Sequence, residues 1–267
     1  MSEPSITSFE NPDRHADASD IIRRHSTNPI DVRDAVLADL DLGFARQVLD
    51  LGCGFGFMAE ALARRVAPQA QIIGIDACAA NEAPFLARVA ATGRTGRFVC
   101  RRIKAQLDWP DHSLDLIVAS YSLYFFPDVL PDIARVLAPH GLFLAVTHTE
   151  SSCRDLLRAA GLTLTDPRLL GDIRNFSVES APRLLAPWFA EAERIDYQNA
   201  LTFTRDQYDA FLTYLRFKLP LLLPESEPGG EIPRPLAKSI RAALARQPSV
   251  KLEKNDAVFR CRGPRCP

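Results

Sequence analysis

The sequence predicts an α/β fold, in which a doubly wound sheet of seven strands carries a helical cap, and three observations support this. Short runs rich in β-branched residues alternate with helical stretches over residues 47–147, as in parallel sheets whose strands are joined by crossover helices. The 267 residues are 47% hydrophobic and 24% charged, which is the balance of a packed globular protein. A helical region then interrupts the pattern before a last strand. We therefore divide the chain into an N-terminal arm and helix (1–43), a sheet core (44–204), a cap (205–249) and a last strand with a tail (250–267).

The N-terminal part should consist of a polar arm and one amphipathic helix. Residues 1–20 are polar and proline-containing, so we expect them to form a mobile arm. Asn28 offers an N-cap side chain, and Pro29 suits the first helical position. With Asp31 as an acid in the first turn and apolar residues four apart behind it, the helix should end near Leu42.

Seven strands follow from the pattern of short apolar runs. The first five are expected at Gln47 to Leu51, Gln71 to Asp76, Arg97 to Arg102, Leu114 to Ser120 and Leu142 to Thr147, with helices near residues 57–66, 79–91 and 128–138 between them. A helix from Ser152 to Ala160 comes next, and a sixth strand lies near residues 193–203. The segment KLEKNDAVFRCR should form the seventh strand, antiparallel to the sixth, after a helical insertion at residues 205–247.

Composition and charge restrict the partners. Formal net charge is -1, from 32 basic and 33 acidic residues, so no global field attracts nucleic acid or an anionic membrane. The apolar runs are strand-sized and the N-terminus has no secretory signal pattern. We therefore expect a cytoplasmic protein that binds neither nucleic acid nor membrane, and we leave a homodimer open.

The six cysteines are expected to be reduced thiols, as is usual in a cytoplasmic protein. Only Cys261 and Cys266, in the tail segment CRGPRC, have a spacing that suggests a metal site. Two thiols make half of a zinc site. We therefore expect two surface cysteines on a flexible end, and no metal.

A glycine-rich turn carries the functional signal. Residues 48–56 read VLDLGCGFG, a buried strand running into a turn that opens a helix. Glycines at such a turn permit positive φ and close approach of a ligand, while the helix N-terminus presents unpaired N–H groups. The spacing differs from the dinucleotide fingerprint G-x-G-x-x-G, because Phe57 stands where the third glycine belongs. A Rossmann-like core that binds a ligand other than a nicotinamide or flavin dinucleotide is therefore expected.

The segment VLDLGCGFG closely resembles motif I of the class I S-adenosylmethionine-dependent methyltransferases. This resemblance implies that S-adenosylmethionine is the cofactor and that the turn holds its amino-acid end, through Asp50, Gly52, Cys53, Gly54 and Gly56. The segment IIGID resembles the second strand of the family, whose terminal acid, here Asp76, accepts hydrogen bonds from both ribose hydroxyls. Asp50 and Asp76 have an alternative interpretation as acids that only cap strand ends.

The resemblance continues through LDWPDHSLDLIVASYSLYFF and ARVLAPHGLFLAVTH, so that it spans roughly residues 45–148, and it is nearest to the small-molecule, type 11-like branch. Ser120 is expected at the cofactor. The family's acid after strand three has no counterpart in residues 102–106, so we expect backbone groups near Ala105 to hold the adenine. His140 also stands where the family commonly has a glycine.

Three side chains beyond the fourth and fifth strands are candidates for catalysis, because ligands of open α/β sheets lie at the carboxyl ends of the strands. Tyr121 and Tyr124 are expected near the transferred methyl group, or alternatively they only anchor the next helix. His148 could take a proton from an acceptor, or it could bind backbone groups. Cys53 is better explained by its small size than as a nucleophile.

The resemblance implies a methyltransferase, and we expect direct in-line transfer to oxygen or nitrogen of a small-molecule acceptor. An RNA or protein methyltransferase and a non-catalytic cofactor-binding protein remain alternatives. The insertion at residues 205–247, together with the arm, is expected to form a lid that selects the acceptor; alternatively it is an ordinary subdomain or a dimer surface. Its apolar helical face is made by Phe211, Tyr214, Leu215, Phe217 and Leu221.

Overall fold

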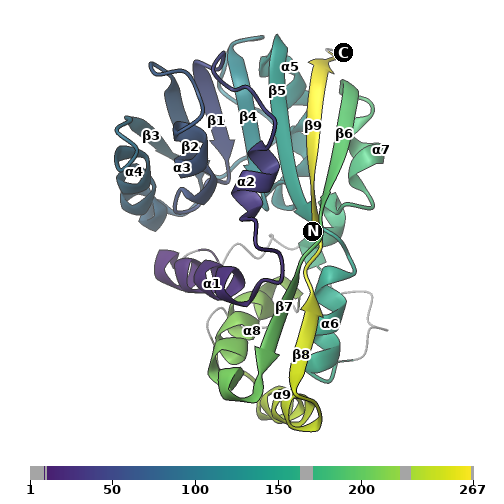
Figure 1. Cartoon of the computed structure of the whole chain (residues 1–267). Helices are drawn as coiled ribbons and strands as arrows, with labels where there is room; N and C mark the ends of the chain where they lie inside the picture. Colours follow the sequence, from purple (N-terminus) through teal and green to yellow (C-terminus); the bar gives the residue numbers. More distant parts are fainter. Residues whose placement is uncertain (1–8, 10, 163–170, 223–229, 266–267) are drawn as a thin grey trace.

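The computed structural model describes residues 9, 11–162, 171–222 and 230–265 (Figure 1). Its main sheet has seven strands in the order β3-β2-β1-β4-β5-β9-β6. These are β1(Gln47–Leu51), β2(Gln71–Asp76), β3(Gly96–Cys100), β4(Leu114–Ser120), β5(Leu137–His148), β6(Phe189–Tyr197) and β9(Asp256–Pro264). Strands β1 to β5 are parallel, whereas β9 is antiparallel to both of its neighbours, β5 and β6. The α/β class and the seven-stranded sheet are thus confirmed.

Helices cover both faces of this sheet. Because successive residues of a strand point to opposite faces, Val48 packs under one helical layer and Leu49 under the other. The first layer contains α2(Val32–Leu37), α3(Phe57–Ala63) and α4(Glu82–Ala90), which the short η2(Ala79–Asn81) precedes; the second contains η3(Leu123–Phe125), η4(Pro127–Val129), α5(Leu130–Val136), η5(Gly171–Phe176) and α7(Ala181–Leu185). Both layers leave the carboxyl ends of β1, β2, β4 and β5 pointing toward the rest of the chain (Figure 1).

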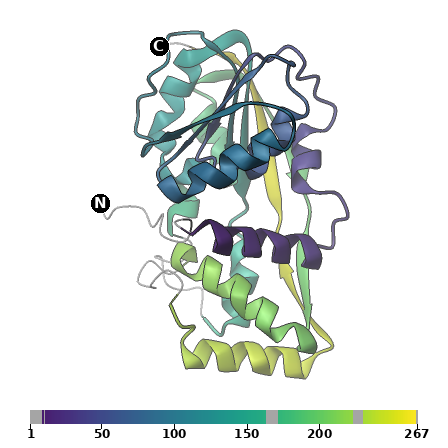
Figure 2. The same cartoon turned by 90° about the vertical axis from the view of Figure 1, so that its left-hand side faces the viewer.

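A second unit, which we call the cap, lies beyond those strand ends. It contains the two-stranded sheet β7(Ala200–Thr204) and β8(Ser249–Glu253), and the helices α1(Pro12–His25), α6(Ser152–Ala159), η6(Arg205–Gln207), α8(Tyr208–Leu222) and α9(Arg234–Arg246). Its own apolar cluster joins residues from both sheet strands and from α1, α6, α8 and α9. Helix α1 crosses between α8 and the main sheet (Figure 2), and it packs on α8 and β7.

The expected sixth and seventh strands are each divided in two, which corrects the sequence expectation. Strand β6 ends at Tyr197 and β7 begins at Ala200, while β8 ends at Glu253 and β9 begins at Asp256. At the break the side chain of Asn199 accepts hydrogen bonds from the amides of Thr27, Asn28 and Ala200. Side-chain acceptors thus satisfy backbone groups where the ladder is interrupted, and the two chains can turn from one sheet into the other.

The N-terminal expectations were also partly wrong. Residues 12–25, of which residues 12–20 were expected in a mobile arm, form α1, and the side chain of Asn11 caps it by accepting a hydrogen bond from the amide of Arg14. The helix expected from Asn28 begins only at Val32, with Asp31 as its N-cap. Asn28 instead accepts a hydrogen bond from the amide of Ile30 and donates to the carbonyl of Gln198, so its side chain serves a turn. Residues 1–8 and 10 of the expected arm lie outside the described residues.

The cysteine tail differs from its expectation. Cys261 belongs to β9 and is fully buried, so it is not a surface thiol; Cys266 lies outside the described residues. Within the described ranges no group of three or more metal-ligating side chains comes together. None of the described helices has the length and hydropathy that a membrane span requires.

Candidate functional site

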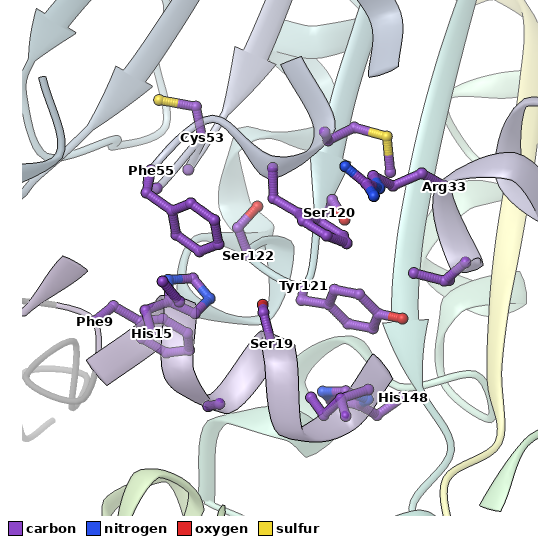
Figure 3. A pocket seen from close by; sticks show the side chains of 18 of the residues that line it. Phe9, His15, Ser19, Arg33, Cys53, Phe55, Ser120, Tyr121, Ser122 and His148 are labelled. Atoms are coloured by element: carbon purple, nitrogen blue, oxygen red, sulfur yellow. The ribbon is translucent and has the colours of Figure 1, made fainter. Parts of the chain in front are cut away.

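A cavity of about 900 Å³ lies where the main sheet meets the cap (Figure 3). Its walls come from the turn between β1 and α3, the ends of β2, β4 and β5, helices α1 and α8, and the junction of β8 and β9. Cys53 and Phe55 lie toward one end of it and His148 toward the other (Figure 3). We call these the turn end and the histidine end.

The turn end is shaped by three glycines with positive φ, at Gly52 (67°), Gly54 (50°) and Gly56 (86°). A Cβ on Gly52 would overlap with Cβ of Ser122, and one on Gly56 would lie 3.0 Å from Cα of Phe85. Gly52 therefore permits packing of β1 against the chain after β4, and Gly56 permits packing of α3 against α4. Gly52 and Gly54 line the cavity, whereas Gly56 does not.

Asp50 is the most unusual side chain at the turn end. It is 1% exposed, and neither carboxyl oxygen has a hydrogen-bond partner within the described structure. Burial, followed by the negative charge of Asp76, raises the pKa of Asp50 to about 8. A buried carboxyl group without partners costs free energy unless a donor or a cation meets it, so Asp50 marks a place for a cationic or hydrogen-bonding ligand group.

Asp76 is held more firmly at the end of β2. Its Oδ2 accepts a hydrogen bond from the amide of Gly54 at 2.9 Å, and its Oδ1 accepts from the amide of Cys78 at 2.8 Å and from Nδ2 of Asn81 at 3.1 Å. A carboxylate has about four lone-pair positions, so Asp76 retains capacity for another donor. The same bonds fix the glycine turn to β2.

The other residues proposed for the cofactor occupy different positions. Ser120 lines the cavity, and its buried hydroxyl has no partner in the described structure. Cys53 lines it too, but burial and the charges of Asp50 and Asp76 raise its pKa well above the ordinary value, which disfavours a thiolate nucleophile. Ala105 is exposed and is not among the lining residues; Arg102 and Ile103, just before it, are. The structure therefore does not bring Ala105 to the cavity.

The three proposed catalytic side chains converge at the histidine end. The rings of Tyr121 and His148 stack with centroids 4.6 Å apart, and Tyr124 lies 6.4 Å from His148 on a nearly parallel plane. Tyr121 has a φ of 56°, which is uncommon for a bulky residue and often marks a functional constraint. All three line the cavity.

Behind these rings lies a buried network that we call the Asp256 network. Asp256 is 1% exposed and accepts hydrogen bonds from the Tyr121 hydroxyl at 2.8 Å, from Nδ1 of His148 at 2.6 Å and from Nζ of Lys254 at 2.6 Å. On the other side of the imidazole, Nζ of Lys218 lies 3.3 Å from Nε2 of His148. Burial and the charge of Lys218 lower the pKa of His148 to about 4, although Asp256 opposes them, so the imidazole is neutral at pH 7.

Helix α1 closes the cavity over the glycine turn. Cε1 of His15 would lie 3.4 Å from a Cβ on Gly54, and its ring stacks on Phe217 of α8 with centroids 5.3 Å apart. The ring also meets the edge of Phe55 at 4.6 Å. Burial, with a contribution from the charge of Lys218, lowers the pKa of His15 to about 3. The result is an aromatic cover contributed by α1, by α8 and by Phe55 of the glycine turn.

Sequence reasoning missed His15, Lys218, Lys254 and Asp256. Lys218 is the only charged residue in the apolar run FKLPLLLP, and Lys254 and Asp256 interrupt the last apolar strand. Charges in otherwise apolar segments are rarely buried unless they are paired, and that signal could have identified these residues. Their partners lie far away along the chain, however, because His148 is 70 residues from Lys218 and 108 from Asp256.

The cavity thus has two chemically different ends. Carboxyl groups and glycine amides at the turn end suit a ligand that carries cationic and hydroxyl groups. Stacked rings with two ammonium groups at the histidine end suit a second, flatter ligand. A site of this volume is within the usual range for small molecules.

The chain matches the family model described as "Methyltransferase domain" over residues 48–141. It is 30% identical over 122 residues to a ubiquinone biosynthesis O-methyltransferase of Vibrio cholerae, covering 44% of this chain and 47% of the relative. It is 28% identical over 148 residues to a demethylmenaquinone methyltransferase of Geobacillus kaustophilus, covering 53% of this chain and 62% of that one. The chain spans about half the length of the first of these relatives.

Among solved structures, the fold is similar to that of a protein described as a putative methyltransferase from Bacillus halodurans, with a TM-score of 0.54 and 14% identity. That likeness covers 94% of this chain and all of the other. At this identity the similarity concerns the fold alone. It extends over the cap as well as the sheet.

Proposed function

This chain belongs to the class I S-adenosylmethionine-dependent methyltransferases, and on that premise we propose that it methylates oxygen or nitrogen of a small-molecule acceptor. The observation that carries the proposal is Asp50, a buried carboxyl group without hydrogen-bond partners in the described structure, which lies beside a glycine turn in a cavity of about 900 Å³. The names of the two relatives, which refer to ubiquinone and demethylmenaquinone, support a small-molecule acceptor.

The turn end fits the donor. S-adenosylmethionine carries an ammonium group, a sulfonium and two ribose hydroxyls. We propose that Asp50 and the turn of Gly52, Cys53 and Gly54 meet its amino-acid part and that Asp76 accepts from the ribose. Ser120 offers a hydroxyl nearby, and the adenine would lie at Arg102 and Ile103, which replace Ala105 in our assignment because they line the cavity. Gly56 contributes indirectly, through the packing of α3.

The donor supplies a methyl group that its sulfonium charge already activates, so the protein must chiefly orient the acceptor in line and exclude water. We propose that Tyr121 and Tyr124 orient the acceptor at the histidine end. For His148 to take a proton, Lys218 must first leave Nε2, since its ammonium group donates there. The aromatic cover of His15, Phe55 and Phe217 would keep water from the transfer.

Replacing Asp76 by alanine should weaken donor binding by roughly 1 to 3 kcal/mol, the range for loss of a buried hydrogen-bonding partner. The ribose hydroxyls would lose their acceptor, and the Gly54 amide would lose its own. Calorimetric titration with S-adenosylhomocysteine measures the effect. An unchanged dissociation constant in a folded variant would show that Asp76 only caps its strand.

Gly52→Ala should weaken donor binding more than the same substitution at a glycine elsewhere that has a similarly positive φ. The new Cβ would collide with Ser122, whose hydroxyl donates to the Leu51 carbonyl at 2.6 Å, so the turn must move. Gly93→Ala is the matched control, because Gly93 has a φ of 77° but nothing within 4 Å of the new atom. Both should lose roughly 1 to 3 kcal/mol of stability through backbone strain, measured by urea unfolding. Equal donor affinity in the two variants would argue against a role for this turn.

Phe217→Ala should impair acceptor turnover far more than donor binding. Phe217 lines the cavity and stacks on His15, so its loss opens the cover to water. Tyr214, one turn earlier, belongs instead to the cap's apolar cluster and is absent from the lining. Tyr214→Ala should therefore chiefly cost stability, by about 3 to 5 kcal/mol. Collapse of donor affinity with intact acceptor kinetics in Phe217→Ala would contradict the lid assignment.

The activity itself can be tested with the purified protein. It should transfer label from S-adenosylmethionine carrying an isotopically labelled methyl group to a component of a metabolite extract, identified by mass spectrometry. Heat-denatured protein provides the control. The proposal fails if the folded protein binds a nicotinamide dinucleotide tightly and does not bind S-adenosylmethionine.

A further inference from the structure

Lys218 occupies an unusual place for a lysine. It lies on α8 in an apolar run, is 6% exposed, and lines the cavity at the histidine end. Desolvating an ammonium group is costly, so buried lysines are rare unless an interaction or a function retains them. Lysine offers donors only and has no acceptor. Whatever meets Lys218 from the cavity must therefore accept hydrogen bonds.

The Asp256 network orients this ammonium group. Because Nδ1 of His148 faces the Asp256 carboxylate at 2.6 Å, that nitrogen carries the proton, and Nε2 presents its lone pair to Lys218. Lys254, which is 6% exposed and also lines the cavity, holds the second carboxylate oxygen at 2.6 Å. Asp256 itself is absent from the lining. The cavity therefore meets two ammonium groups here, while the carboxylate lies behind the rings.

The low pKa of His148 has a consequence for the acceptor. A base whose pKa is about 4 removes a proton from an alcohol or phenol poorly at neutral pH. An acceptor that arrives already ionised needs no such base. Ammonium groups in a desolvated site stabilise an anionic oxygen through charge-assisted hydrogen bonds.

We propose that Lys218, together with Lys254, binds an anionic oxygen of the acceptor, so that the substrate class is a small carboxylate or phenolate. This inference rests on the proposed function, because it assigns the histidine end to the acceptor and the turn end to the donor. The stacked rings of Tyr121 and His148 provide a flat surface for the acceptor's apolar part.

The test uses the full chain saturated with S-adenosylhomocysteine and matched probes. By calorimetry, benzoate should bind about ten- to a hundredfold more tightly than benzamide, the factor expected for a charge-assisted hydrogen bond. In a second arm, 4-nitrophenol at fixed pH should gain the visible absorbance of its ionised form on binding. A preference for benzoate alone identifies a carboxylate acceptor, and a gain of nitrophenolate alone identifies a phenolate.

Lys218→Met should abolish both effects and leave S-adenosylhomocysteine affinity unchanged, whereas Lys251→Met, at an exposed position on β8, should retain both. The inference is overturned if the wild-type protein binds benzoate no more tightly than benzamide and also shows no gain of nitrophenolate. This outcome needs no variant. Loss of S-adenosylhomocysteine affinity in Lys218→Met overturns it too, because Lys218 would then serve the donor's carboxylate. If the wild-type protein binds no S-adenosylhomocysteine, the proposed function is contradicted instead. The preference for benzoate over benzamide can then still be measured in the absence of S-adenosylhomocysteine.

Discussion

The ligand-free wild-type protein should lose stability steeply as the pH rises from 4 to 8, and the variant Asp50→Asn should lack this loss. The pKa of Asp50 rises from 3.8 to about 8 on folding, so the folded state holds a proton that the unfolded state releases in this window. Stability from this group is therefore fully present below about pH 4 and is lost as the pH rises through about 8, by at most about 1.4 kcal/mol per pH unit. Asparagine cannot ionise, so the variant lacks this dependence.

Urea unfolding of both proteins at several pH values measures the difference between their free energies of unfolding. That difference should shift steadily in favour of the variant as the pH rises. Asp128→Asn, at an exposed position, should show no such trend. The variant should also bind S-adenosylmethionine more weakly, because an ionised carboxylate is the better partner for an ammonium group. Parallel stability curves for wild type and Asp50→Asn would contradict the assignment of a raised pKa.

Asp256→Asn should destabilise the protein by about 3 to 5 kcal/mol, the usual cost of removing one partner from a buried ion pair. Lys254 would lose its carboxylate, and the bonds from Tyr121 and His148 would weaken. Urea unfolding at neutral pH gives the free energy. Asp196→Asn, at an exposed pair with Arg194, should cost about 0 to 1 kcal/mol.

The double variant Lys254→Met with Asp256→Leu provides a second comparison. Removing both charges leaves no uncompensated ion from this pair. The double variant should therefore lose less free energy of unfolding than the sum of the losses of Lys254→Met and Asp256→Leu made singly. A loss below about 1 kcal/mol for Asp256→Asn alone would show that the network contributes little to stability.

The same network predicts lability in acid. Burial by itself would raise the pKa of Asp256, but Lys254 and His148 hold it well below the ordinary range, so its contribution is present above that range and is lost as the pH falls through the folded value. The pKa of His148 falls from 6.5 to about 4 on folding. Its neutral form is therefore favoured in the folded state, and stability also declines as the pH falls through this window.

Local patterns predicted β1, β2 and β4 well because these strands are short apolar runs, and β1 also ends in a glycine turn. The same kind of pattern misled at the N-terminus. Asn11-Pro12 and Asn28-Pro29 carry the same signal for a helix start, yet only the first begins a helix. Asn28 instead donates a hydrogen bond to the carbonyl of Gln198, which is 170 residues distant in the sequence. Helix α1 has too few apolar residues for its helical period to be seen in the sequence. Tertiary contacts, which no local pattern contains, decided both cases.

The candidate site could be predicted only where it lies within one stretch of chain. Asp50, the glycines and Asp76 lie at or just beyond the carboxyl ends of two adjacent strands, so their convergence follows from parallel topology. His148 could be placed at a strand end for the same reason. Lys218 comes from the cap, however, and its position beside His148 depends on how the cap lies against the end of the main sheet.

The junction between the two sheets has a consequence for evolution and for engineering. Tyr197 and Asp256 are paired across β6 and β9, so the stretch between them leaves and re-enters the main sheet at neighbouring positions. This segment can be replaced by a related one without changing the strand order of the main sheet, because its two ends already lie next to each other. Helices α1 and α6 lie outside that stretch but share its apolar cluster. A chimaera would therefore also need the residues of α1 and α6 that pack against the replaced segment. Asp256 lies at the junction, so the stability of the chimaera would show whether the new segment provides a cation to pair with it.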